Sequence, residues 1–263
     1  MASDYWTESR RPLVSLAFLL PLLGLYEFGV LWLGGSNTHA VRNGADTWMR
    51  GWLLQLGIDR PWILPMLIVV ILAGWHVLAR HPWQISRETL FGMFAESLLC
   101  AILLLVAGQL LSLGCRHIGL PAASFPATAA NAVSYIGAGI YEEVLFRLLL
   151  LPAVFLLLRG LLLPVGLSAL LAIFVTSLVF SMAHYLQPGP ASMVASLEPM
   201  TQAAQQLSQS PELWFGFGFR LMAGLVFAGL FLTRGFGVTV GCHAFYDLMV
   251  GILMTAPDAA QNC

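Results

Sequence analysis

Residues 129–158 read AANAVSYIGAGIYEEVLFRLLLLPAVFLLL. The run is long and apolar enough to cross a lipid bilayer as a helix, because a spanning helix needs about 20 mostly apolar residues. It also carries Glu142, Glu143 and Arg147 near its middle. An ionisable side chain at the centre of a membrane helix costs about 2.5–3.5 kcal/mol on insertion scales, so three of them close together need a reason. This stretch predicts both a membrane protein and a polar site inside it.

Six further stretches share this apolar character. With the first they predict seven spans, at Leu13–Leu33, Trp62–Ala79, Leu90–Leu113, Ala129–Leu158, Leu161–Tyr185, Leu213–Thr233 and Gly237–Thr255. A helical stripe of tryptophans and leucines at Thr47–Ile58 predicts an eighth helix, which we interpret as lying on the membrane surface. We therefore expect an all-α polytopic transmembrane helix bundle of about seven to eight membrane helices, with residues 1–263 forming a single membrane domain.

The composition supports this class and excludes others. Hydrophobic residues make up 59% of the 263 residues and charged residues 10%, with a formal net charge of −1. Soluble domains carry about 25% charged residues, so a soluble globule and a disordered chain are excluded. No basic field is present that would attract nucleic acid. The four cysteines show no zinc-binding spacing.

One of the two adjacent glutamates has a partner on its own helix. Glu143 and Arg147 are four residues apart, so they share a helix face and can pair. Glu142 lies about 100° further around the helix and lacks such a partner. Groups from other helices must therefore hold Glu142, and a carboxylate held in this way suits a general base.

Two later spans carry histidines. Residues 180–184 read FSMAH at the end of the fifth span, and residues 243–247 read HAFYD in the last one. His243 and Asp247 are four apart and share a face. If three helices bring Glu142, His184, His243 and Asp247 together, they form a polar cluster that can activate water.

The pattern Glu142-Glu143-x-x-x-Arg147, then Phe180-x-x-x-His184, then His243-x-x-x-Asp247 resembles the CPBP family of CAAX-processing and bacteriocin-processing or immunity proteins. These are glutamate-dependent intramembrane proteases. The similarity covers about residues 128–255, which we expect to be the catalytic core. The resemblance implies that Glu142 is the general base and acts on water together with His184. It also implies that Glu143 and Arg147 form a supporting ion pair.

The resemblance further implies that His243 and the residue four positions later stabilise the oxyanion, and that Phe180 packs behind the site. This later position is commonly Asn in the family and is Asp247 here. An ionised Asp cannot donate a hydrogen bond to an oxyanion and would repel it. Either Asp247 is protonated, or it accepts a hydrogen bond and orients His243. We favour the second interpretation.

Other protein classes could use some of these residues. A zinc protease could use two His and one Glu, but the chain has no H-E-x-x-H motif. A rhomboid-like serine protease would need a more complete motif around Ser168, and a presenilin-like aspartyl protease would need a second membrane aspartate. Outside the enzymes, a transporter or an immunity or scaffold protein could carry the same cluster without proteolysis. The effect of Glu142→Gln would separate these readings.

We therefore expect an intramembrane endopeptidase that needs no cofactor and no metal, integral to a bacterial inner membrane. Its partners would be a membrane-anchored protein or peptide substrate and the lipid bilayer, with no nucleic acid. A cytoplasmic N-terminus leaves six arginines inside and four outside. This slight excess places the loop Gln187–Glu212, which follows His184, on the outer side. The loop is interpreted as a connector, with a gate as the alternative. Prenylation of the substrate stays open, and the residues Glu27, His76 and Glu96 have no assigned role.

Overall fold

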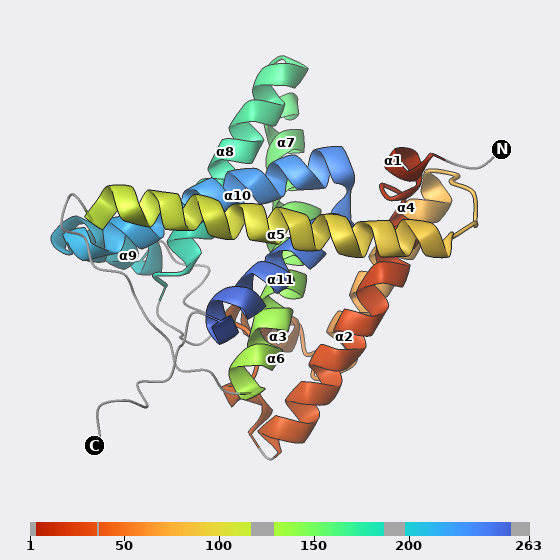
Figure 1. The fold of residues 1–263 in the computed structure, drawn as a ribbon, viewed down its shortest axis with the longest axis horizontal. Coiled ribbons are helices and arrows are strands. Elements are labelled where there is room, and N and C mark those ends of the chain that lie inside the picture. Colours follow the sequence, from red (N-terminus) through yellow and green to blue (C-terminus); the bar gives the residue numbers. More distant parts are fainter. Residues whose placement is uncertain (1–3, 36, 117–128, 187–197, 254–263) are drawn as a thin grey trace.

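The computed structural model describes residues 4–35, 37–116, 129–186 and 198–253, and within these ranges the chain is helical without β-strands. Figure 1 shows the helices in chain order. They are α1 (Tyr5–Glu8), α2 (Pro12–Gly34), η1 (Thr38–Ala40), α3 (Gly44–Gln55), α4 (Ile63–Leu78), α5 (Arg87–Arg116), α6 (Ala129–Gly137), η2 (Ala138–Glu142), η3 (Val144–Leu150), α7 (Leu151–Gly160), α8 (Val165–Ala183), α9 (Glu198–Gln209), η5 (Pro211–Leu213), α10 (Trp214–Arg234) and α11 (Phe236–Leu253).

The all-α class is confirmed, and the protein is an integral membrane protein. A helix occupies each of the seven predicted stretches and the predicted eighth element. Within the described residues, four helices are long and apolar enough to cross a membrane by themselves: Pro12–Gly34, Arg87–Gly114, Val165–Ala183 and Pro211–Arg234. The helix Ile63–Leu78 is apolar but shorter.

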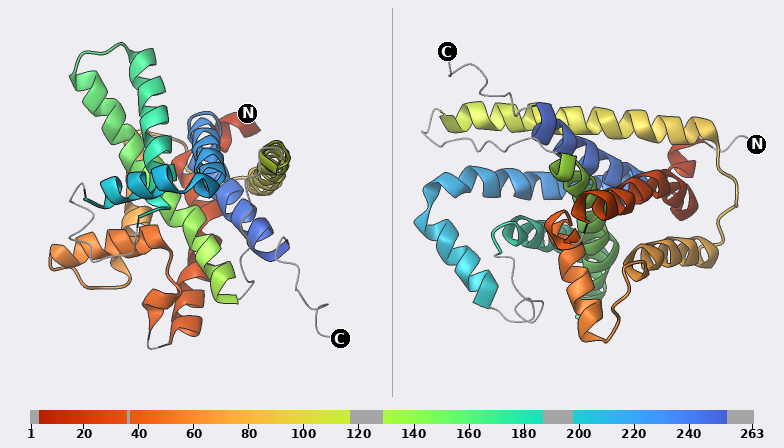
Figure 2. Two further views of the ribbon diagram at one scale, coloured as in Figure 1. Left: turned by 90° about the vertical axis from the view of Figure 1, so that its left-hand side faces the viewer. Right: turned by 90° about the horizontal axis from the view of Figure 1, so that it is seen from below.

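Helix α11 lies at the centre of the bundle. It packs against α5, α6, η2, α10 and α2, whereas α8 packs against α10 and α7. Figure 2 shows α5 along one edge of the molecule, with α11 packed against it. Small and β-branched residues of α11, including Val238, Val240, Cys242 and Ala244, are fully buried, which allows helices to approach it from several sides.

The fourth predicted span is continuous but not regular. Between α6 and α7 the chain forms two stretches of π-helix, η2 and η3, with Glu143 at their junction. Pro152 stands in the first turn of α7 and cannot donate the α-helical hydrogen bond to Leu148. The crowding of its ring against that carbonyl favours a wider turn just before it. Such π-turns are rare and occur frequently at functional sites.

A glycine sets the distance between η2 and α11. A Cβ atom added to Gly139 would lie 2.6 Å from the backbone nitrogen of Ala244. Only a residue without a side chain permits this approach. The contact brings the glutamates that follow Gly139 next to His243, which precedes Ala244.

Candidate active site

The structure brings the seven predicted site residues into one cluster. They come from three parts of the bundle: the η2–η3 segment supplies Glu142, Glu143 and Arg147, the end of α8 supplies Phe180 and His184, and α11 supplies His243 and Asp247.

The two oxygens of the Glu142 carboxylate have different surroundings. Oε2 lies 3.7 Å from Nε2 of His184 and 3.9 Å from Nε2 of His243. Both distances exceed a hydrogen bond, and Oε2 is buried without a hydrogen-bond partner among the described residues. Separations of this size suit a bridging water molecule. Oε1 accepts a hydrogen bond from Nδ2 of Asn43 at 3.0 Å.

The tautomer of neutral His184 follows from its backbone contact. Its Nδ1 lies 2.9 Å from the carbonyl oxygen of Phe180. A carbonyl oxygen can only accept, so Nδ1 carries the proton and donates it. The lone pair of Nε2 therefore faces Glu142. The side chain of His184 is 27% exposed, which makes it the most accessible member of the group around Glu142.

Glu143 holds two partners at once. Its Oε1 accepts a hydrogen bond from Nδ1 of His243 at 2.7 Å, and its Oε2 forms an ion pair with Nε of Arg147 at 3.2 Å. Arg147 also donates from Nη2 to the carbonyl oxygen of Gly224 on α10, at 3.0 Å. Glu143 is fully buried and Arg147 is 1% exposed, so each charge depends on the other for compensation.

Aromatic rings enclose this ion pair. The guanidinium of Arg147 lies 4.5 Å from the ring centroid of Phe180 and 5.6 Å from that of Phe227. The ring of His243 stacks on Phe227, with centroids 4.5 Å apart and an interplanar angle of 15°. Phe180 thus packs behind the polar groups. Phe227 was missed, because one more phenylalanine in an apolar helix carries no signal in the sequence.

Asp247 contacts the second nitrogen of the His243 ring. Its Oδ2 lies 3.4 Å from Nε2 of His243, and Nδ1 of the same ring donates a hydrogen bond to Glu143. The ring is therefore held at Nδ1 by the facing segment and contacted at Nε2 by Asp247, so the interpretation that Asp247 orients His243 stays a prediction. Asp247 lies beside the same Nε2 edge that faces Glu142.

Of the polar residues without an assigned role, the two glutamates form contacts between helices. Glu27 of α2 accepts from the Tyr141 hydroxyl at 2.5 Å and pairs with Arg50 at 2.9 Å. Glu96 of α5 pairs with Arg234 and accepts from the Tyr5 hydroxyl. His76 is fully buried, and its ring contacts that of Trp83.

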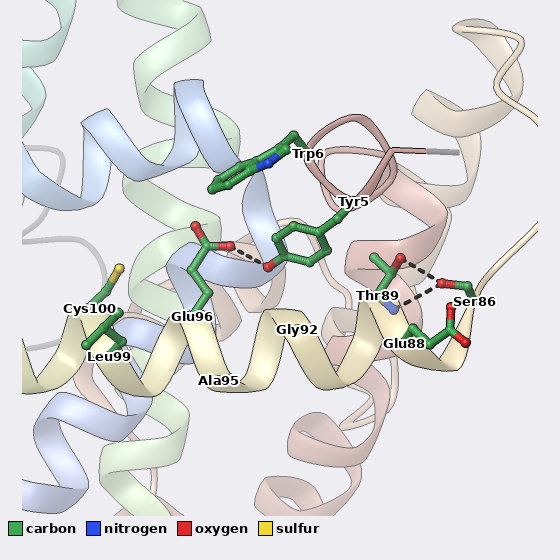
Figure 3. A pocket seen from close by; sticks show the side chains of 10 residues that line it. All are labelled: Tyr5, Trp6, Ser86, Glu88, Thr89, Gly92, Ala95, Glu96, Leu99 and Cys100. Atoms are coloured by element: carbon green, nitrogen blue, oxygen red, sulfur yellow. Dashed lines mark hydrogen bonds between the residues drawn. The ribbon is translucent and has the colours of Figure 1, made fainter. Parts of the chain in front are cut away.

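A pocket in the described part of the chain lies away from the seven residues. It measures about 640 Å³ and lies between α1 and the first half of α5, where Tyr5 reaches Glu96 (Figure 3). Burial, followed by the hydrogen bond to Glu96, raises the pKa of Tyr5 to about 12. The described residues also contain no group of three or more His, Cys, Asp or Glu side chains that could hold a metal ion.

The fold and the cluster define a helical membrane protein with a buried glutamate–histidine site. Residues 125–249 match the family model described as type II CAAX prenyl endopeptidase Rce1-like. This segment contains all seven residues, and the match confirms the predicted relation to the CPBP/CAAX proteases. The family supports a peptide-bond hydrolase. Comparison with curated proteins and with solved structures gives no significant match.

Proposed function

We propose that the protein is a glutamate-dependent intramembrane endopeptidase. It hydrolyses a peptide bond near the membrane-associated end of a protein or peptide. The observation that carries this proposal is the 3.7 Å separation between Oε2 of Glu142 and Nε2 of His184, inside a bundle of apolar helices. Both atoms are acceptors, and one water molecule can donate a proton to each. Such a water is held and polarised from two sides.

The reaction needs only this water and the substrate. Glu142 takes a proton from the water as the water oxygen attacks the scissile carbonyl carbon, and the carbonyl oxygen becomes an oxyanion. When the carbon–nitrogen bond breaks, Glu142 returns the proton to the leaving amine. The water is thereby divided between the two products, and the base is regenerated.

His243 is the donor proposed for the oxyanion. A doubly protonated imidazolium has an N–H group at each nitrogen, so one can hold Glu143 while the other points into the site. Charged donors that are fixed before the reaction stabilise an oxyanion more effectively than mobile water. Glu143 and Arg147 then serve to hold this ring, with Phe180 packed behind them.

The remaining features of the proposal concern the membrane. We place the protein in a bacterial inner membrane, with the seven apolar stretches crossing it and residues 128–255 as the catalytic core. The substrate is a membrane-anchored protein or peptide. The site opens on the side of the loop Gln187–Glu212, which begins just after His184.

Cleavage by the purified, detergent-solubilised protein tests this function. The substrates are membrane-anchored peptides with varied C-termini, and wild type is compared with Glu142→Gln and His184→Ala. The cleavage rate of each variant should fall by about 10²–10⁴-fold, which is the usual effect of removing a group that takes part in general acid–base catalysis. The control is Glu88→Gln, which removes an exposed carboxylate at the start of α5. Cleavage that a chelator abolishes and zinc restores would instead indicate a metalloprotease. No cleavage by any form would favour a transporter or scaffold.

A further inference from the structure

We propose that Asn43 is a positioning residue for Glu142, and that the active site is therefore completed by a segment outside the matched residues 125–249. This inference rests on the proposed function. Nδ2 of Asn43 donates to Oε1 of Glu142 at 3.0 Å, across 99 positions of sequence. Both residues are 9% exposed. A hydrogen bond to a carboxylate in such surroundings is stronger than one between neutral groups in water.

The backbone around Asn43 holds its side chain in place. Asn43 is the N-cap of α3, and its Oδ1 accepts from the backbone N–H of Ala45 at 2.8 Å. Its own backbone N–H donates to the hydroxyl oxygen of Tyr26 at 3.1 Å. Its carbonyl oxygen accepts from Thr47 at 3.0 Å. A residue held at one side-chain oxygen and at both backbone polar groups has little freedom to turn its amide away from Glu142.

The same contacts determine which way the amide faces. With Oδ1 against the N–H of Ala45, the NH₂ group must face the carboxylate of Glu142. The reversed amide would set N–H against N–H and a carbonyl oxygen against a carboxylate, so the hydrogen-bond network excludes it.

A charge-balanced network of ion pairs supports Asn43 through Tyr26. Asp46, fully buried, pairs with Arg42 and with Arg50 at 2.6 Å each, and Arg50 pairs with Glu27 at 2.9 Å. Tyr26, the partner of the Asn43 backbone, donates to Asp46 at 2.7 Å. Two carboxylates and two guanidiniums thus neutralise each other inside the bundle, which makes the network a stable support.

This network also reaches Glu142 through the residue that precedes it in the chain. The hydroxyl of Tyr141, the residue directly before Glu142, donates to Glu27 at 2.5 Å. The network therefore holds both the backbone next to Glu142 and, through Asn43, one of its carboxylate oxygens. Oε2 is left facing His184 and His243. The terminal torsion of a glutamate is broad, so without Asn43 the carboxylate would rotate and lose this alignment.

Two substitutions separate the contact with Glu142 from the capping of α3. Ser and Asp are good N-caps, so Asn43→Ser and Asn43→Asp keep the hydrogen bond to Ala45 while removing the NH₂ donor. We expect kcat to fall on the order of 10²-fold, with KM within about twofold and only a small loss in Tm, because misalignment of a reacting group affects the chemical step. Asn43→Asp should be the slower variant, since it places a second carboxylate against Glu142. A purely structural role for Asn43 would lower Tm in both variants without this fall in kcat.

A matched control comes from the same loop. Asn37→Ser makes the same change at an exposed residue whose side chain caps nothing, and it should leave kcat unchanged. If Asn43→Ser and Asn43→Asp keep the wild-type kcat while Glu142→Gln is inactive, the inference is wrong and the proposed function stands.

A second measurement needs no substrate. In a double-mutant cycle on thermal unfolding, Asn43→Ser and Glu142→Ala should shift Tm non-additively, because the two side chains contact each other. Additive shifts would overturn the inference whatever the peptide assay gives. Failure of the wild type to cleave any peptide would count against the proposed function, and the cycle would still decide whether Asn43 holds Glu142.

Discussion

At the residue scale, two adjacent glutamates differ because their surroundings differ. Glu143 is fully buried, with one oxygen on His243 and the other on Arg147. Glu142 has one oxygen held by Asn43 and the other without a protein partner among the described residues. A carboxylate that binds a histidine with one oxygen and pairs with an arginine through the other serves to hold its neighbours in place, while an oxygen with neither a donor nor a paired arginine can take part in chemistry.

Removing the charge of Glu143 is expected to destabilise the protein. Glu143→Gln leaves the guanidinium of Arg147 buried and uncompensated, which costs about 3–5 kcal/mol when one partner of a buried pair is lost. The double variant Glu143→Gln/Arg147→Met removes both charges and should recover much of this loss. Unfolding of the detergent-solubilised protein measures both. A cost below about 1 kcal/mol for the single variant would show that solvent reaches this pair.

Asp247 lies where the family commonly has Asn, so its charge can be tested directly. Asp247→Asn removes a carboxylate 3.4 Å from Nε2 of His243 and supplies an amide donor. We expect kcat to rise by about tenfold, a fraction of the 10²–10³ that a complete oxyanion donor supplies. Asp247→Ala, which adds no donor, should give a smaller gain. A fall in kcat for Asp247→Asn would show that the negative charge is needed to keep His243 doubly protonated.

At the element scale, the sequence predicted where the helices lie better than how they are built. Hydropathy located each apolar helix, because burial in lipid or protein leaves a clear compositional pattern. The π-helical turns of η2 and η3 left no such pattern, since hydrogen-bond register does not change composition. The four-residue spacing of Glu143 and Arg147 predicted that they form an ion pair. The contact of Asn43 with Glu142 was missed, because it joins distant segments and has no local signature.

The close approach of η2 to α11 leads to a prediction at this scale. Gly139→Ala places a Cβ atom 2.6 Å from the backbone of Ala244, so the two helices must separate. We expect a loss of about 1–3 kcal/mol in stability, as for other overpacked sites. Activity should fall with it, because His243 moves away from Glu143.

The control for this substitution is another helical glycine. A Cβ atom at Gly218 of α10 meets nothing within 4 Å. Gly218→Ala should therefore be neutral, or stabilising by up to about 1 kcal/mol through helix propensity alone. Equal effects of the two substitutions on Tm and activity would contradict the role assigned to the Gly139 contact.

At the scale of the whole molecule, the part of the chain before the matched segment contacts the site and joins helices to one another. α2 and α3 carry the network that reaches Glu142 through Asn43. On another side, the pair of Glu96 and Arg234 joins α5 to α10, and Tyr5 of α1 joins the same pair. These contacts involve charges with low exposure, so they fix how the helices meet more than they add to stability. Glu27 and Glu96 thereby gain structural roles that the sequence alone left open.

The side on which the site opens is a property of the whole molecule as well. The loop predicted at Gln187–Glu212 lies partly outside the described residues, and its described part contains α9. The loop between α4 and α5 and the helix α9 lie at opposite ends of α5 (Figure 1). Gln205 of α9 and Gln84 of the α4–α5 loop are both exposed. They provide a matched pair of positions for labelling.

We expect α9 to face the outside of the cell. In a variant whose four native cysteines are replaced, Gln205→Cys should react with a membrane-impermeant maleimide in intact cells. Gln84→Cys should react only after permeabilisation, because the slight excess of arginines holds its loop in the cytoplasm. This pattern would suit a protease that trims exported, membrane-anchored substrates. The reverse pattern would place the opening beside His184 on the cytoplasmic side and restrict the substrates to those reached from the cytosol.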